Sequence, residues 1–136
     1  MIPDAAPVYS AETNGLIVRV VVSYVPHQSQ PPRQYVWAYM VEIENASARP
    51  MQLLSRRWII TDGQGRIEEV EGPGVVGEQP VIGPGEVYQY TSGCPLPTPT
   101  GSMVGTYRMR IEDGGFFDAA IPAFSLDLPG RIRTVN

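Results

Sequence analysis

Three glycines, Gly72, Gly74 and Gly77, have the G-x-G-x-x-G spacing that could bind a phosphate group. In dinucleotide-binding folds these glycines join a buried strand to a helix, whose first N–H groups hold a pyrophosphate. Here the strand before the glycines, at 67–71, is short, and its acidic side chains would repel a phosphate. Pro80 prevents a helix of useful length after the glycines. The pattern therefore predicts a wide turn in which glycine supplies positive φ angles. The alternative is a loop that binds a small anion or a nucleotide through backbone N–H groups, with candidate residues Gly72, Gly74, Gly77, Glu78 and Gln79.

The other reactive side chains are few and scattered. All ten basic residues are arginines, which excludes a lysine Schiff base and a P-loop lysine. His27 and Cys94 are the single histidine and the single cysteine, so one chain cannot build a Cys/His zinc site. Neither residue has the neighbours of a nucleophile elbow or of a thiol with a lowered pKa. We therefore predict no catalytic residue and no cofactor.

Four glutamates close to the glycines could in principle supply oxygen ligands to a hard cation such as magnesium. They are Glu68, Glu69, Glu71 and Glu78. Side chains at 68, 69 and 71 cannot all project to one face of a strand, because successive side chains of a strand alternate. Solvated charges on an edge strand are the favoured interpretation, and the predicted metal site is none.

The segment from Ser55 to Trp58 has the most unusual strand interior, because it holds Arg56 and Arg57 side by side. Arg56 shares a face with Trp58, an arrangement typical of interfaces, while the alternative is a buried tryptophan with Arg56 reaching the rim of the sheet. The predicted strand at 35–44 has its aromatic side chains on one face, and it also has apolar residues, among them Val36 and Met40, on the opposite face. This pattern indicates a central strand or one covered by another chain. The candidate interaction surface is Val36, Met40, Arg56 and Arg57.

These residues lie within a chain dominated by alternation with period two, which is typical of strands. The predicted strands span about 16–24, 35–44, 53–61, 66–70, 86–92, 103–111 and 116–128. Asp62–Gly65 and Asp113–Gly115 read as hairpin turns between them. Pro122 suggests an edge or a bulge in the last strand. No segment free of proline has a sustained helical apolar stripe, and Trp37 and Trp58 are expected to be buried.

About seven short strands in 136 residues predict an all-β antiparallel sandwich of two sheets. The size allows one domain, which we place at 15–129, with an N-terminal tail over 1–14 and a C-terminal tail over 130–136. A net charge of −4 argues against nonspecific nucleic-acid binding, which requires many phosphate contacts. The apolar runs are too short to span a bilayer, and the N-terminus lacks the pattern of a secretory signal. The expected location is the cytoplasm.

The string from Leu53 to Gly63, LLSRRWIITDG, resembles the LLSRHWxITD signature of the ApaG family, also called CorD. Further strings in the family's order are GPGVVGEQP at 72–80, PGE at 84–86, YTSG at 90–93, TPTGSMVG at 98–105 and IPAF at 121–124. The resemblance covers about residues 15–129. It departs at Arg57, where the family usually has histidine.

This resemblance implies an immunoglobulin-like or fibronectin type III-like sandwich, consistent with the alternation. It also implies an association with cobalt and magnesium efflux, and related eukaryotic domains suggest protein binding. We therefore expect a noncatalytic binding module that acts on cobalt or magnesium resistance indirectly, through a protein partner or by forming a homo-oligomer. The alternatives are the anion or nucleotide sensor described above and, less favoured, a phosphate-ester hydrolase.

Overall fold

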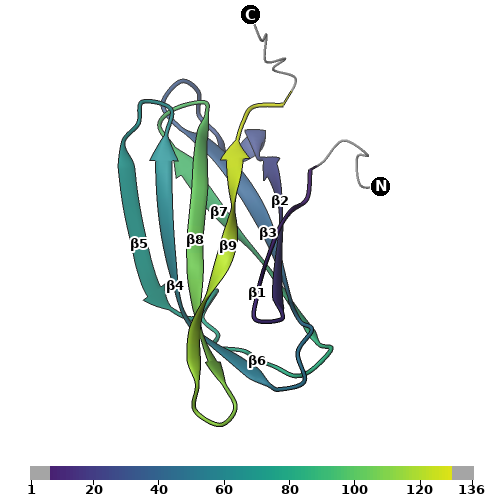
Figure 1. The fold of residues 1–136 in the computed structure, drawn as a ribbon. Coiled ribbons are helices and arrows are strands. Elements are labelled where there is room, and N and C mark those ends of the chain that lie inside the picture. Colours follow the sequence, from purple (N-terminus) through teal and green to yellow (C-terminus); the bar gives the residue numbers. More distant parts are fainter. Residues whose placement is uncertain (1–6, 130–136) are drawn as a thin grey trace, which may run out of the picture.

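The computed structural model describes residues 7–129, which fold into two antiparallel β-sheets packed face to face (Figure 1). The first sheet has the order β1-β2-β3-β7, and the second has the order β5-β4-β8-β9 with β6 paired to β4. The strands are β1 (Tyr9–Thr13), β2 (Leu16–Tyr24), β3 (Tyr35–Asn45), β4 (Met51–Asp62), β5 (Ile67–Pro73), β6 (Val81–Ile82), β7 (Val87–Leu96), β8 (Gly101–Ile111) and β9 (Phe116–Leu126). A single 3-10 turn, η1 (Pro26–Gln28), is the only helical element among the described residues. The predicted all-β sandwich is confirmed.

β1 corrects the expectation of a tail over residues 1–14. Its five residues pair with β2 from Tyr9 opposite Val20 to Thr13 opposite Leu16, and Asn14 and Gly15 form the turn between them. Both turn residues have positive φ angles, which suits an Asn-Gly hairpin. Residues 1–6, and the predicted tail at 130–136, lie outside the part that the structure describes.

Alternation along the strands produces the core, because every second side chain of each strand points between the sheets. Leu16, Val18 and Val20 of β2 are fully buried, as the pattern predicts. Trp37 is also fully buried, and its indole N–H donates to the carbonyl of Asp127 at 2.8 Å.

Trp58 is buried in the opposite sheet, where its ring packs edge-on against the rings of Tyr39 and Phe124 at centroid distances of 5.3 and 5.9 Å. Gly105 lies opposite Trp58 in the register. A β-carbon on Gly105 would approach the Arg57 carbonyl oxygen and lie 3.2 Å from the indole, so this strand position has room only for glycine. The predicted burial of both tryptophans is confirmed.

The two long sides of the sandwich differ. On one side β1 and β2 pack against β9, so the sheets are closed there. On the other side β7 and β5 are the last strands of their sheets, and a lateral opening lies between them. Within residues 7–129, no helix is long and apolar enough to cross a membrane.

Candidate functional site

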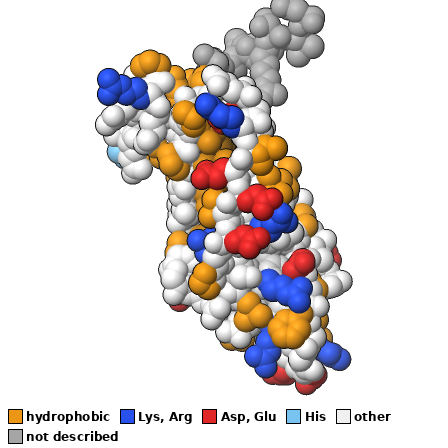
Figure 2. Space-filling model, turned by 90° about the vertical axis from the view of Figure 1, so that its left-hand side faces the viewer, with side chains coloured by type: hydrophobic (Ala, Val, Ile, Leu, Met, Phe, Trp, Pro, Cys, Tyr) orange, Lys and Arg blue, Asp and Glu red, His pale blue; other side chains and the backbone are white. Residues whose placement is uncertain are grey.

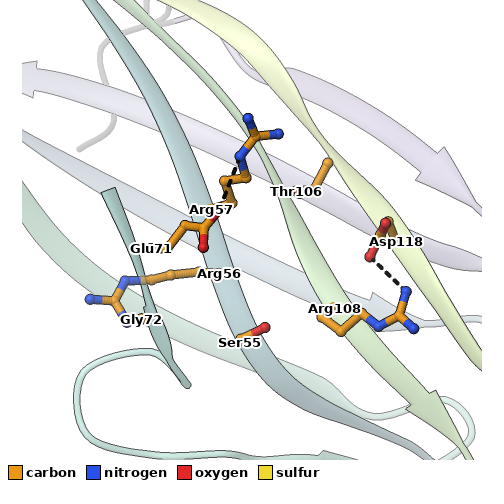
Figure 3. Close-up of a pocket in the computed structure, with 8 residues that line it drawn as sticks. All are labelled: Ser55, Arg56, Arg57, Glu71, Gly72, Thr106, Arg108 and Asp118. Carbon is orange, nitrogen blue, oxygen red and sulfur yellow. Dashed lines mark hydrogen bonds and ion pairs between the residues drawn. The ribbon is translucent and has the colours of Figure 1, made fainter. Parts of the chain in front are cut away.

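A shallow groove of about 490 Å³ lies on the outer face of the second sheet. We call it the outer groove; Figure 3 shows its lining side chains on β5, β4, β8 and β9. The antiparallel register builds it, because Arg57 of β4 lies opposite Thr106 of β8, and Ser55 lies opposite Arg108. All four side chains have the parity that points away from the core. The lining residues are Ser55, Arg56, Arg57, Glu71, Gly72, Thr106, Arg108 and Asp118.

Each outward arginine of the groove already has carboxylate partners. Arg57 Nη2 lies 2.9 Å from Glu69 Oε1, and its Nε lies 3.3 Å from Glu71 Oε1. Arg108 Nη1 lies 3.2 Å from Asp118 Oδ1. Figure 3 draws the Arg57–Glu71 and Arg108–Asp118 pairs, each of which joins neighbouring strands of the sheet. These side chains are about half exposed, so solvent screens the pairs and each contributes at most about 1 kcal/mol.

The aromatic ring of Phe116 lies against one of the arginines that line the groove. Arg108 lies over this ring, with its guanidinium carbon 5.4 Å from the ring centroid, and the ring itself is half exposed. Val104 is another exposed apolar side chain of β8 on the same outer face. An arginine over an exposed aromatic ring beside apolar surface is a combination enriched at protein interfaces.

Arg56 points the other way, into the lateral opening between β7 and β5. Its Nη1 donates to the carbonyl oxygens of Pro73 at 3.1 Å and Gly74 at 2.9 Å. Gly72 is its partner in the register, and a β-carbon there would lie 3.0 Å from Nη1. The side chain thus reaches the rim of the sheet and holds the chain that follows β5. This is the predicted alternative in which Trp58 is buried and Arg56 reaches the rim.

The lateral opening contains two shallow hollows of about 290 and 270 Å³, which we call together the edge cleft. Both hollows share Tyr39, Arg56, Trp58 and Ser92 in their linings. Cys94 also borders the cleft, yet it is only 3% exposed, and burial, with a smaller effect of Glu68, raises the pKa of its thiol to about 11. The thiol is therefore protonated at neutral pH and a poor nucleophile.

The glycine segment forms a tight hairpin whose polar groups bond within the protein. Val75 and Glu78 exchange backbone hydrogen bonds of 2.8 and 2.9 Å, and the Gly74 N–H donates to the Leu54 carbonyl. Gly74 and Gly77 have φ angles of +60° and +80°, so the predicted positive φ is confirmed at these two glycines. It is wrong at Gly72, which is instead constrained by the Arg56 guanidinium.

The two polar candidates of this segment also bond internally. The Gln79 side-chain amide donates to the Leu54 carbonyl at 2.8 Å, and the Glu78 carboxylate accepts from the Tyr88 hydroxyl at 3.0 Å. These bonds favour the interpretation of the segment as a structural turn. Anion or nucleotide binding there stays an untested prediction without a contact that favours it.

The four residues predicted as one interaction surface lie in three places. Arg57 lies in the outer groove, and Arg56 borders the edge cleft. Val36 and Met40 belong to the outer face of the first sheet, where Met40 accepts a hydrogen bond from the Gln89 amide at its sulfur. Val36 is only 8% exposed, beside η1 and the Ser29 hydroxyl that accepts from its N–H, so it is no part of an exposed surface.

Thr106, Arg108 and Asp118 complete the outer groove and were missed by the sequence reasoning. The alternation at 103–111 does place Arg108 on an outward face, and Asp118 follows a predicted turn at matching parity. What local sequence does not contain is that β8 lies beside β4 rather than beside another strand.

Possible metal ligands are not gathered in one place. Glu69 and Glu71 pair with Arg57, Glu78 bonds to Tyr88, and His27 lies exposed in η1. Among residues 7–129 there is no group of three or more His, Cys, Asp or Glu side chains that could hold a metal ion.

Known proteins match both the sequence and the fold of the chain. The profile of the ApaG domain matches residues 26–111, which include β3, β4, β5 and β7. The chain belongs to the ApaG family. Protein ApaG of Mesorhizobium japonicum is 59% identical over 129 residues, covering 94% of this chain and 99% of the relative. Protein ApaG of Paramagnetospirillum magneticum is 58% identical over the same length and shares.

A solved structure supports the same family. The crystal structure titled as the putative ApaA protein from Bordetella pertussis is 51% identical, with a TM-score of 0.83, covering 92% of this chain and 100% of that one. That protein thus shares the two-sheet architecture seen here. The ApaG match also confirms the family resemblance drawn from the LLSRRWIITDG string.

Proposed function

We propose that the chain is a noncatalytic protein-binding module whose outer groove docks a protein partner. The observation that carries the proposal is the pair of half-exposed arginines on neighbouring strands, Arg57 and Arg108, of which Arg108 lies over the exposed ring of Phe116. Their weak, screened carboxylate pairs can exchange for carboxylates or carbonyls of a partner at small cost. Arginine and aromatic side chains are the residues that dominate binding energy at interfaces.

The chemistry of the site favours binding over catalysis. The groove is shallow, and its acidic and basic groups are paired with one another instead of converging on a point where a substrate atom could sit. The one cysteine borders the other opening and is held protonated by burial. We therefore assign no residue of the groove a role in a reaction.

An indirect contribution to cobalt or magnesium homeostasis belongs to the same proposal, since a binding module influences ion levels through what it binds. The proposed location is the cytoplasm, where a lone unpaired cysteine such as Cys94 is stable as a thiol. Neither statement requires a metal ion to bind the chain itself.

The experiment compares affinity capture by the wild-type chain and by the double variant Arg57→Glu/Arg108→Glu from native lysate. Arg49→Glu is the matched control, because Arg49 is an exposed arginine with a single distant partner, Asp113, at 3.8 Å. We expect a protein that binds the wild-type chain and the control, and whose purified form binds the double variant roughly tenfold more weakly or worse. A partner that the double variant retains at full affinity would refute the outer groove as the docking site.

A further inference from the structure

The two open edges of the sandwich are protected very differently. β5 carries Glu68, Glu69 and Glu71, and charge on an edge strand discourages pairing with another chain. Figure 2 looks onto this side of the molecule and shows acidic and basic side chains along it. β7 is ten residues long and has no charged residue, and its only strand partner among residues 7–129 is β3. β7 is therefore the unprotected edge.

The hydrogen bonds of β3 show which residues of β7 have unpaired backbone groups. The carbonyl of Val36 accepts from Val25 and its N–H donates to Ser29, so even-numbered residues of β3 bond away from β7. Asn45, an odd-numbered residue, exchanges backbone bonds with Glu86 and Gly85 at the β7 side. Antiparallel ladders alternate in this way, so the even-numbered residues of β7 bond to β3. The outward backbone groups belong to Val87, Gln89, Thr91, Gly93 and Pro95.

Pro95 fits this assignment. It lies opposite Val36 in the register, at a position where its missing N–H would face solvent. Proline inside a sheet is confined to such edge positions. Four N–H groups, at Val87, Gln89, Thr91 and Gly93, therefore remain on the open edge, followed by a residue that cannot donate.

These four positions of β7 can pair with the same four positions of a second copy of the chain. If a second strand runs antiparallel with a two-fold axis at Tyr90, Gln89 lies opposite Thr91 of the second copy, and Val87 lies opposite Gly93 of the second copy. The two-fold axis generates each of these pairs twice, and every pair exchanges two hydrogen bonds, about eight in all. Pro95 falls just outside the pairing. A register shifted by two residues in one direction leaves the N–H of Gly93 in each strand without a partner. A shift by two residues in the other direction places Val87 opposite Pro95, which has no N–H to donate.

Side chains support the same register. Val87 is 51% exposed, and the residue opposite it would be a glycine, whose surface the valine side chain can cover. Val76 is 55% exposed at the tip of the glycine hairpin and lines the edge cleft next to Tyr90 and Ser92, close to the axis. No charged side chain of β7 opposes another across the axis.

We propose that two copies of the chain associate through antiparallel pairing of β7 with β7, which joins the two first sheets into one continuous sheet. The occupant of this edge is a second copy, because the register that uses every outward N–H is the symmetric one. The surface differs from the outer groove, so the homodimer and the proposed docking of a partner can each fail without the other.

The first experiment measures the mass of the full chain by sedimentation equilibrium from about 5 to about 500 µM, where mass action must reveal a dimer. We expect a concentration-dependent dimer for the wild-type chain. Thr91→Pro removes an outward N–H without touching a bond to β3, and Gln89→Lys adds charge to the edge; we expect each to weaken dimerisation roughly tenfold or more. Ser10→Lys, on the opposite edge strand β1 of the same sheet, is the control that should leave the dimer intact.

The second experiment tests the register by disulfide trapping. Gln89→Cys and Thr91→Cys chains, distinguishable by a size tag, are mixed and oxidised with native Cys94 still buried. Directly opposed residues fall within disulfide distance, whereas residues two positions off do not. Random pairing of equal amounts already gives about twice as much mixed disulfide as either homodisulfide, so we expect the mixed disulfide to exceed this twofold ratio clearly. A chain that stays monomeric throughout, a dimer broken by Ser10→Lys but not by Gln89→Lys, or preferential homodisulfides would each overturn the proposal.

Discussion

Arg56 and Arg57 are neighbours in the sequence and have different roles, because adjacent residues of a strand point to opposite faces. Arg57 pairs with Glu69 and Glu71 on the outer face, where solvent keeps the pairs weak. Arg56 donates to two backbone carbonyls at the edge cleft and thereby positions the glycine hairpin. Arg57 is thus available to a partner, while Arg56 holds the fold together.

Gly74 is the glycine whose replacement should cost most. Its φ of +60° disfavours any β-carbon, and an added β-carbon would collide with the Glu78 carbonyl oxygen. We expect Gly74→Ala to lower the free energy of unfolding by roughly 2 kcal/mol or more, measured by urea denaturation. Gly77→Ala is the control. The φ of Gly77 is also positive, but a β-carbon added there would have no neighbour within 4 Å, so the free energy of unfolding should fall by only about 1 kcal/mol. Equal losses for the two variants would contradict the collision.

Asp62, at the turn between β4 and β5, makes the stability of the folded protein depend on pH. Its carboxylate accepts from Arg66 Nε at 2.8 Å and from the backbone N–H groups of Gln64 and Arg66. The hydrogen bond from the Arg66 side chain is the largest cause that lowers the pKa of Asp62, the two backbone N–H groups add to it, and desolvation opposes it. Because the folded pKa lies below the unfolded value of about 4, this stabilisation is present above that pH and is lost as the pH falls through the folded pKa.

We therefore expect the melting temperature of Asp62→Asn to lie below that of the wild-type chain at pH 7, and the difference to shrink toward pH 3. Thermal unfolding followed by circular dichroism measures both. Asp118→Asn makes the same charge change in an exposed pair and should show a much smaller effect at pH 7. A difference that stays constant with pH would count against the ionised carboxylate as its source.

At the scale of elements, β1 closes one side of the sandwich. Its Tyr9 ring packs 6.0 Å from the Phe124 ring of β9, and the Ala120 N–H of β9 donates to the Thr13 hydroxyl. The strand thus ties the two sheets together at the edge opposite the cleft. By contrast β5 and β7 leave their side open, which concentrates both the edge cleft and the proposed dimer contact on one side of the molecule.

Removing the side chain that makes this closure should destabilise the fold. We expect Tyr9→Ala to lower the free energy of unfolding by roughly 1–3 kcal/mol, because it deletes half-buried aromatic contact with the core. Ser10→Ala, which changes an exposed side chain of the same strand, should be close to neutral. Denaturant titrations give both values, and a neutral Tyr9→Ala would mean that β1 contributes little.

For the whole molecule, the distribution of possible ligands predicts weak intrinsic metal binding. Tight cobalt sites favour imidazole or thiolate ligands, and here His27 is exposed in η1 while Cys94 faces the interior with a pKa raised to about 11. We expect titration calorimetry with cobalt or magnesium chloride to give dissociation constants weaker than about 100 µM. Low-micromolar binding that is lost on replacing His27 or particular carboxylates would contradict an indirect role in ion homeostasis.

From the sequence we predict seven of the nine strands within residues 7–129, all but β1 and the two-residue β6, together with the faces that form the core and the burial of both tryptophans. Pleating ties each of these properties to period-two alternation. β1 escaped this reasoning because its sequence, YSAET, is short and mostly polar, and it is a strand only through its pairing with β2 and its packing on β9. Propensity for such a segment is decided by its neighbours.

The positions of the candidate functional surfaces depend on the tertiary structure. Arg57, Thr106 and Arg108 meet because β4 pairs with β8 in one register, and Val36 is covered because η1 folds back beside it. The unpaired edge of β7 likewise depends on the order of strands in the first sheet. Local periodicity tells which way a side chain points, but strand order and register arise from contacts between residues far apart in the chain, which no local pattern encodes.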